Sequence, residues 1–337
     1  MRTRPRYLAT LSSLLLGVGA LLCCLLSCDE SFNPSAPFQP RMVVYCVLTT
    51  ESDTQYVRVY STYNPPDNDR STNLDEIPVT DANVTISSDS ALYQFQKTVV
   101  QRVDKSRYAS DIVAYISYPF KLARGKTYKL TVTSPTVGTA TATATVPSVA
   151  SISPSNFFAV ADPYKNAYVE RYGVNVYLSA QAKAFLVRIY VDYLASTPQG
   201  WQLRRRQIPV LMKPISLYEG TWTYIYPVVK RRQWSSARYQ ESELFTIDAW
   251  IKMLENDIWL YDGPSVRFLQ AVIHVIQFDE PLYNYYGVAN ISRDRYSVRI
   301  DEPDYTNMHG GVGVFGSFAV DSTAYELPET ISRPGPK

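Results

Sequence analysis

The sequence has 337 residues, of which 33 are basic and 31 acidic, and its formal net charge is +2 at pH 7. A charge this close to neutrality argues against nucleic-acid binding through a global basic field. The chain is long enough for two domains of ordinary size. Its 27 tyrosines, together with frequent threonine, valine and serine, favour strands and amphipathic surfaces.

The first 27 residues have the pattern of a secretory signal peptide. Three arginines precede an uncharged apolar run from Leu11 to Leu26, which is somewhat short for a bilayer span. Leu25-Leu26-Ser27-Cys28 follows directly and resembles the lipobox of bacterial lipoproteins. We therefore predict cleavage before Cys28 and lipidation of its thiol, and the alternative is an uncleaved membrane helix. Acyl chains contribute about 0.8 kcal/mol per buried CH₂ group, so two or three chains anchor a protein stably.

Residues 28–40 are predicted to form a flexible tether, because residues 31–40 hold three prolines and few large apolar side chains. Asp29 and Glu30 resemble the acidic signal that exports some lipoproteins to the cell surface, and an ordinary polar tether is the other interpretation. Cleavage removes three arginines and no acid, which leaves 30 basic against 31 acidic residues. Cys46 is then the only cysteine besides Cys28, so lipidation of Cys28 excludes an intramolecular disulfide.

Residues 41–147 are predicted to form a β-sandwich of the immunoglobulin or fibronectin type. Short segments, several of which alternate apolar with polar residues, are separated by turn-rich stretches. Seven such strands are typical of a sandwich. The predicted strands are Met42–Leu48, Gln55–Tyr63, Ala82–Ser87, Leu92–Val103, Arg107–Ile116, Tyr128–Ser134 and Gly138–Val146.

Residues 148–332 are predicted to form a second, mainly β domain with a minor helix, so the fold class is all-β. Ser148–Pro154 is predicted to be a linker, and residues 333–337 a loose tail. Helical spacing of apolar residues indicates a short helix at Glu243–Met253, and Pro281–Val288 is either a helical turn or a loop. The predicted strands are Asn175–Leu178, Phe185–Tyr193, Ile208–Met212, Trp222–Val229, Val266–Phe278 and Phe315–Val320.

The chain contains, in this order, the lipobox with its tether and Met42-Val43-Val44-Tyr45, Val79 to Ile86, Gly125 to Val132 with the Thr-rich strand after it, and Asn307 to Gly316. Together these segments resemble the DUF4249 lipoprotein family of Bacteroidota. Residues 195–265 match nothing in the family pattern, and Met308-His309 departs from it. Members tend to be encoded beside TonB-dependent receptors, so the resemblance implies an outer-membrane location and such a receptor as partner, not a chemistry.

The sequence offers little for catalysis. Residues 311–316 fit G-x-G-x-x-G, but a dinucleotide site needs a strand before the glycines and a helix after them. His274 and His309 are the only histidines and lack the spacing of a metal site. We predict no enzyme activity, metal or cofactor, and a carboxylate pair of the glycosidase type stays open as an alternative. The glycines predicted to form a structural turn are Gly310, Gly311, Gly313 and Gly316.

Aromatic and basic residues are concentrated between residues 201 and 234. The basic clusters 204–206 and 230–232 fit either an anionic partner or a solvated face. The aromatic residues around them fit either a sugar or protein contact or the packing of amphipathic strands. We predict an interaction surface that contains Trp201, Arg204, Arg205, Arg206, Trp222, Tyr224, Tyr226, Arg231, Arg232 and Trp234.

The sequence therefore predicts a lipid-anchored binding or accessory protein that faces the cell surface or the periplasm. With a TonB-dependent receptor as partner, it would serve nutrient capture or envelope assembly. The alternative is a surface lipoprotein that binds a glycan or peptide by itself. A hydrolase is a third hypothesis, resting only on acidic residues that have no assigned role.

Overall fold

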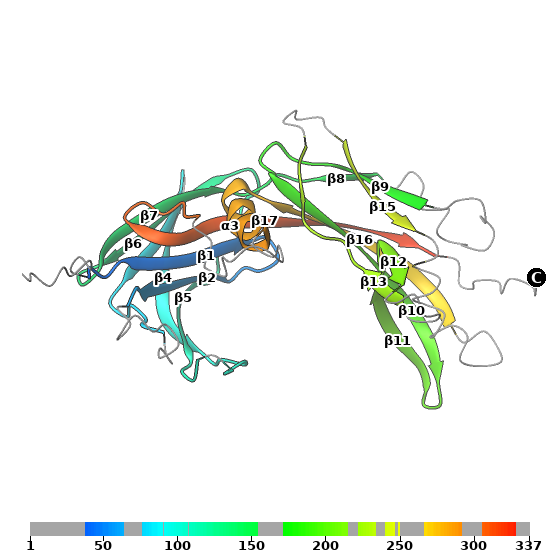
Figure 1. Cartoon of the computed structure of the whole chain (residues 1–337), viewed down its shortest axis with the longest axis horizontal. Coiled ribbons are helices and arrows are strands. Elements are labelled where there is room, and N and C mark those ends of the chain that lie inside the picture. The colour runs from blue at the N-terminus through cyan, green and yellow to red at the C-terminus, as the bar shows by residue number, and fades with distance from the viewer. Residues whose placement is uncertain are drawn as a thin grey trace, which may run out of the picture. The chain divides into compact units, whose positions relative to one another are not determined.

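Strands make up most of the described chain in the computed structural model (Figure 1). The described residues form seventeen strands, β1 to β17, and one helix, α3, which confirms the all-β class. They lie almost wholly in one compact unit, residues 40–337. The structure describes residues 38–63, 76–89, 91–106, 108–153, 171–214, 222–233, 240–246, 249, 266–291 and 305–327.

All seven strands predicted before residue 148 are present. Strand β1 shows why, because its side chains alternate between buried and half-buried, as a strand with one face on a core requires. The strands are β1 Met42–Thr49, β2 Gln55–Ser61, β3 Asn83–Ser88, β4 Ala91–Val100, β5 Ile112–Ser117, β6 Thr127–Ser134 and β7 Gly138–Thr145.

These seven strands follow the order β1-β2-β5-β4-β3-β6-β7 in the sheet, and β17 (Gly311–Glu326) lies on the other side of β1. β17 pairs with β1 in parallel, whereas β2 pairs with β1 antiparallel. One core cluster contains side chains from β1, β2, β3, β6 and β7. Phe315 and Ala319 of β17 belong to this cluster, so the end of the chain completes a core that its first third begins.

The second core lies between a sheet of four long strands and a small three-stranded sheet. The four strands have the order β11-β10-β16-β17 and continue through β1 into one twelve-stranded sheet, and the small sheet has the order β15-β9-β8. Val174, Val176 and Phe245 of the small sheet share a buried cluster with residues of β10 and β16. The remaining elements are β8 Ser151–Ser153, β9 Arg171–Tyr177, β10 Ala184–Thr197, β11 Gly200–Gln207, β12 Leu211–Pro214, β13 Trp222–Ile225, β14 Lys230–Arg231, β15 Gln240–Thr246, β16 Val266–Phe278 and α3 Glu280–Ile291.

Strand β17 is shared by both cores. Its first half pairs with β1 and its second half with β16, and Phe318 is in register with a residue of each. Phe315 is buried in the first core, while Tyr325 packs against the second. Figure 1 shows β17 running without a break from beside β1 to beside β16. The domain boundary predicted near residue 148 stays a prediction.

The predicted helix at Glu243–Met253 is wrong at its start. Residues 243–246 belong to β15, where they pair with β9 and alternate between buried Glu243 and Phe245 and exposed Leu244. Ala249 is helical, and the other residues of that prediction lie outside the described part. The predicted linker contains the short strand β8. Of the two alternatives for residues 281–288, the structure has a helix, α3.

Candidate interaction surface

Strand β11 presents part of the predicted surface on one face of the large sheet. Residues 185, 187, 189, 191 and 193 of β10 are buried in the core, so the even-numbered side chains of β10 point to the opposite face, which we call the outer face. Arg205 is in register with Asp192, and Trp201 with Ser196. Residues in register share a face. Trp201, Leu203 and Arg205 therefore lie on the outer face, and Arg204 and Arg206 point to the other side.

Arg205 is held in place by a carboxylate. Its Nε and Nη2 donate to Oδ1 and Oδ2 of Asp192 at 2.6 and 2.8 Å, and Gln270 Nε2 donates to Oδ2 at 2.8 Å. The hydrogen bonds from Arg205 lower the pKa of the Asp192 carboxyl. The guanidinium lies over the Tyr190 ring at 5.8 Å, while 52% of the Arg205 side chain remains exposed. This arginine is thus pre-oriented and still accessible.

Trp201 is the exposed aromatic anchor of the outer face. Its side chain is 45% exposed, and the guanidinium carbon of Arg267 lies 4.9 Å from its ring. Leu203 beside it is 68% exposed, and Leu269 is also exposed at a bulge where the β10–β16 register shifts. Bulges re-aim side chains and often occur next to functional sites. The combination offers an apolar contact flanked by oriented arginines.

His274 belongs to the same face. Its ring meets the Tyr190 ring edge-to-face at 5.2 Å. Burial, followed by the charge of Arg205, lowers the pKa of His274, which keeps the imidazole neutral at pH 7. Among the described residues, no group of three or more His, Cys, Asp or Glu could hold a metal ion.

The second basic cluster lies far from the first. β14 pairs with residues 184–185 of β10, whereas Arg204 is in register with Tyr193. Nine residue positions along a strand correspond to about 30 Å. The two clusters predicted to form one surface therefore lie apart, one at the start of β10 and one beyond its middle.

Two of the three side chains of this second cluster have internal partners. Lys230 Nζ lies 2.6 Å from buried Glu243, whose pKa is raised by burial, against the effect of Lys230. Arg232 is only 8% exposed and donates to the Ser179 carbonyl at 2.7 Å, while Arg231 is exposed. Of the predicted aromatic residues, Trp222 and Tyr224 belong to β13 and Tyr226 follows it, so they come from a separate two-stranded sheet. Trp234 lies outside the described residues.

The glycines predicted to form a turn lie where other parts of the chain approach β17 closely. Gly313 has a φ of +115°, and a Cβ there would lie 2.0 Å from the Val44 carbonyl oxygen. A Cβ on Gly311 would meet the Met42 carbonyl oxygen at 2.8 Å, and one on Gly316 would meet α3 at Leu282. Gly310, with a φ of +80°, packs in the same way on Thr139. These glycines permit the parallel β1–β17 pairing and the seating of α3.

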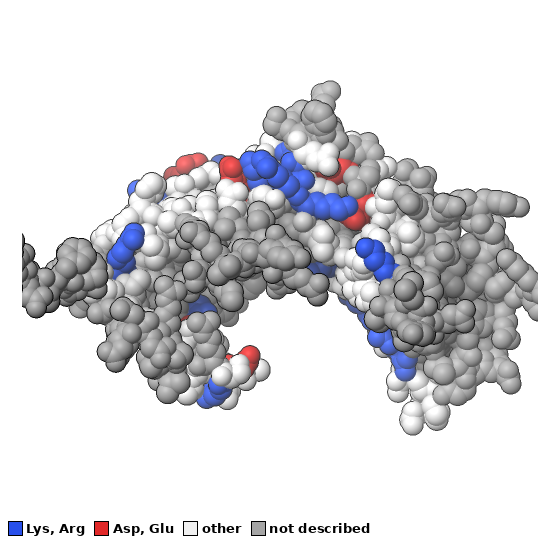
Figure 2. Space-filling model, viewed as in Figure 1, with Lys and Arg blue, Asp and Glu red and all other residues white. Residues whose placement is uncertain are grey.

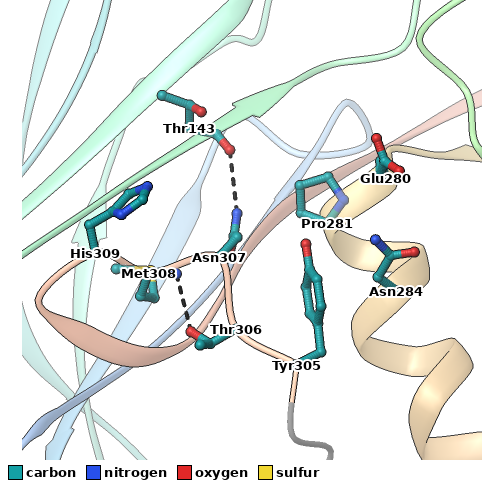
Figure 3. Close-up of a pocket in the computed structure, with 9 residues that line it drawn as sticks. All are labelled: Thr143, Glu280, Pro281, Asn284, Tyr305, Thr306, Asn307, Met308 and His309. Atoms are coloured by element: carbon teal, nitrogen blue, oxygen red, sulfur yellow. Dashed lines mark hydrogen bonds between the residues drawn. The ribbon is translucent and has the colours of Figure 1, made fainter.

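A pocket of about 500 Å³ opens beside this glycine segment (Figure 3). Asn307 spans the segment, because its side chain donates to the Phe315 carbonyl at 2.7 Å and accepts from the Phe315 amide at 2.9 Å. His309 exchanges backbone hydrogen bonds with Thr141 of β7. In Figure 3 the Tyr305 side chain stands between Asn307 and Asn284 of α3. Burial raises the pKa of Tyr305, against the effect of its hydrogen bond with Asn284.

Asp279 is a buried carboxyl directly before α3. It caps α3, since its Oδ1 accepts the Leu282 amide at 2.9 Å, and its Oδ2 accepts the Ser317 hydroxyl at 2.8 Å. Burial raises its pKa to about 6. The signal was present in the sequence: an aspartate, then Glu280 and Pro281 in the first helical turn, is a typical helix start.

The predicted lipidation site Cys28 and the predicted export signal, Asp29 and Glu30, lie outside the described residues. In the part of the chain that is described, no helix is long and apolar enough to span a membrane. Cys46 is buried in β1, and burial raises the pKa of its thiol, which keeps it protonated and unreactive.

Comparison with known proteins gives a family. No curated protein matches the sequence. Among solved structures, the C-terminal globular domain of an oligosaccharyltransferase from Pyrococcus abyssi is similar over 87% of this chain and 50% of that chain, with 9% identity and a TM-score of 0.21. The chain thus spans half the length of that protein, and a TM-score this low does not establish a shared fold. Residues 29–324 match the family model described as a domain of unknown function, DUF4249, and the chain therefore belongs to the DUF4249 family.

Proposed function

We propose that this chain is a lipid-anchored binding or accessory protein without catalytic activity. The observation that carries the proposal is the outer face of β10, β11 and β16, where exposed Trp201 and Leu203 lie beside two arginines fixed by neighbouring side chains. Tryptophan and arginine are enriched among the residues that dominate binding energy in protein interfaces. Arg205 is pre-oriented by Asp192, so it loses little entropy on binding.

The proposed partner is a TonB-dependent outer-membrane receptor, and the proposed role is nutrient capture or envelope assembly. Lipid on Cys28 would hold the protein at the outer membrane, with the cell surface favoured by the acidic pair after it. The proposed anchor rests on the lipobox, and the proposed partner rests on the tendency of family members to be encoded beside TonB-dependent receptors.

Co-purification in mild detergent tests the partner. We expect an outer-membrane β-barrel protein to co-purify with the wild type and to be lost when Trp201→Ala and Arg267→Ala are combined, because both sides of the cation–π pair are removed. Tyr118→Ala is the matched control, since Tyr118 is an aromatic residue with 73% exposure outside the outer face. Repeated purification without any such partner would contradict the proposal.

Palmitate labelling with protease treatment of intact cells tests the anchor and the location. We expect Cys28→Ala to abolish the label and external protease to degrade the wild-type protein. Retained label would show that the anchor is elsewhere. Loss of label with full protection from protease would place the protein in the periplasm.

A second candidate function is binding of a glycan or peptide without a receptor. The half-exposed indole of Trp201 favours it, because sugars and extended peptides stack on such rings. A glycan array and a peptide array would then show ligands whose binding falls on Trp201→Ala while the far-UV circular dichroism is unchanged. Equal binding by both proteins would remove this candidate.

A further inference from the structure

A cavity of about 280 Å³ at the start of β10 brings cationic side chains together. It is lined by Gln181, Lys183, Arg231, Arg232, Gln233 and Glu280. Figure 2 shows basic side chains gathered on this face, close to where Figure 1 places α3. This cavity lies at the opposite end of β10 from Trp201, so it is separate from the outer-face residues proposed above to bind a partner.

Backbone pairing explains why these side chains converge. β14 returns antiparallel to the start of β10, with Arg231 in register with Ala184. The Arg232 amide donates to the Lys183 carbonyl at 2.9 Å, and the Lys183 amide donates to the Phe278 carbonyl at 2.8 Å. Phe278 is followed within two residues by Glu280, the first residue of α3. Three chain segments distant in sequence thus supply one lining.

The lining has an excess of positive charge. Lys183 Nζ lies 3.0 Å from Glu280 Oε1, so these two charges offset each other. Arg232 is nearly buried beside the cavity, where a charge is weakly screened. Arg231 is exposed, and its side chain makes no ion pair within the described ranges. Such a lining favours an anion.

The cavity also needs a hydrogen-bond donor from its occupant. The side-chain oxygen of Gln181 is buried, and within the described part of the chain no donor reaches it. Most buried polar atoms of native proteins have a partner, so an exception calls for an explanation. A ligand hydroxyl that enters the cavity, with a rotation of the Gln181 side chain, would supply one.

We propose that this cavity binds a small organic acid that carries hydroxyl groups beside its carboxylate, of the size of one sugar acid. The carboxylate pairs with the exposed Arg231 and is attracted by the charge of buried Arg232, and a neighbouring hydroxyl donates to Gln181. The volume is just below the range of about 300–1,000 Å³ that is typical of ligand pockets, which limits the ligand to about one monosaccharide unit. The inference rests on the proposed function only in treating the chain as a binding protein, and it needs no receptor.

Titration calorimetry on the full chain purified in detergent tests the proposal, with glucuronate, glucose and inorganic phosphate as probes. We expect glucuronate to bind at least about tenfold more tightly than glucose, because a charge-assisted hydrogen bond is lost with the carboxylate. We also expect it to bind more tightly than phosphate, which lacks the polyol. Equal affinity for glucuronate and glucose, equal affinity for glucuronate and phosphate, or no binding of glucuronate would each overturn the proposal.

Two variants locate the site. Arg231→Gln should weaken glucuronate binding about tenfold. Gln181→Met should weaken the binding of glucuronate but leave the binding of phosphate unchanged. Arg41→Gln is the matched control, because Arg41 is an exposed arginine at the start of β1. Glucuronate binding that is unchanged in Arg231→Gln would overturn the assignment. Receptor co-purification measured on Arg231→Gln should be unaffected, so failure of this site and failure of the receptor proposal are distinguishable.

Discussion

Asp192 connects strands β10, β11 and β16 on the outer face through the hydrogen bonds that it accepts from Arg205 and Gln270. In Asp192→Asn the charge is lost and an NH₂ group, itself a donor, faces the donors of Arg205 or Gln270. We therefore expect a loss of about 2 kcal/mol in the free energy of unfolding at pH 7. The folded-state pKa of Asp192 is lowered, so its contribution is present above the unfolded pKa, near 4, and is lost as the pH falls further.

Urea unfolding at pH 7 and at pH 3 measures both effects on Asp192→Asn. The difference in unfolding free energy between variant and wild type should shrink at pH 3. Asp89→Asn is the control, because that carboxylate is exposed and only loosely paired with Lys126. The same loss at both pH values would contradict the assigned role.

Asp279 carries the opposite pH dependence. Its folded-state pKa is raised to about 6 from an ordinary value of 3.8, so the protonated form is favoured in the folded chain. Its contribution is therefore fully present below pH 4 and declines by about 3 kcal/mol as the pH rises to 6. Asp279→Asn keeps an acceptor for the Leu282 amide and cannot ionise. We expect this variant to gain stability relative to wild type as the pH rises from 4 to 7. Urea unfolding at several pH values measures this, and an equal change of the unfolding free energy with pH in both proteins would contradict the prediction.

At the scale of elements, Gly313 fixes how β17 lies against β1. Gly313→Ala combines a positive φ with a Cβ placed 2.0 Å from the Val44 carbonyl oxygen, so we expect a loss of more than about 3 kcal/mol. Gly138→Ala is a matched control, because Gly138 has a φ of +100° but nothing within 4 Å of the added Cβ. It should cost only about 1–2 kcal/mol for the backbone strain. Similar midpoints of thermal unfolding for the two variants would argue against close approach as the cause.

Strands with a regular burial pattern were predictable, and those defined by long-range pairing were not. β1 and β16 can be predicted from their apolar residues alone, because one face of each strand packs on a core. β11 was missed, since its side chains are almost all exposed and only its pairing with β10 makes it a strand. Residues 243–246 have apolar spacing that also suits a helix, and pairing with β9 decides for a strand.

The candidate surface was predictable in its anchor but not in its extent. Trp201 and the arginines after it were visible in the sequence, whereas the hairpin register that turns Arg204 away from Arg205 was not. Arg267 and His274 join the outer face from a strand more than 60 residues away. Partners brought together at this separation leave no local pattern in a single sequence.

At the scale of the whole molecule, the first core depends on the end of the chain. Met308, Phe315 and Ala319 are buried in it, and β1 pairs with β17 along its full length. We therefore expect a fragment of residues 41–147 to lack cooperative unfolding and to give a poorly dispersed amide NMR spectrum. A well-dispersed spectrum with a sharp unfolding transition would instead establish residues 41–147 as an independent domain, as the sequence predicts.

Asp321 ties together segments that surround both cores. It accepts hydrogen bonds from the Arg124 guanidinium, the Ala150 amide and Gln277 at 3.0 to 3.2 Å. Asp321→Ala leaves Arg124 without this partner, and we expect a loss of about 3 kcal/mol. Calorimetry should then show a broader thermal transition than in the wild type. An unchanged single peak would mean that the strand pairing of β17 couples the two cores without the Asp321 side chain.

The parallel pairing of β1 and β17 also has a mechanical consequence. A pull between residue 41 and the C-terminal end of β17 acts along both strands in opposite directions. The eight pairs from Met42↔Gly311 to Thr49↔Phe318 are then loaded together in shear, whereas an antiparallel hairpin pulled at its open end yields one hydrogen bond at a time. A chain that is held at its N-terminus and pulled at the C-terminal end of β17 would resist with all of these pairs at once.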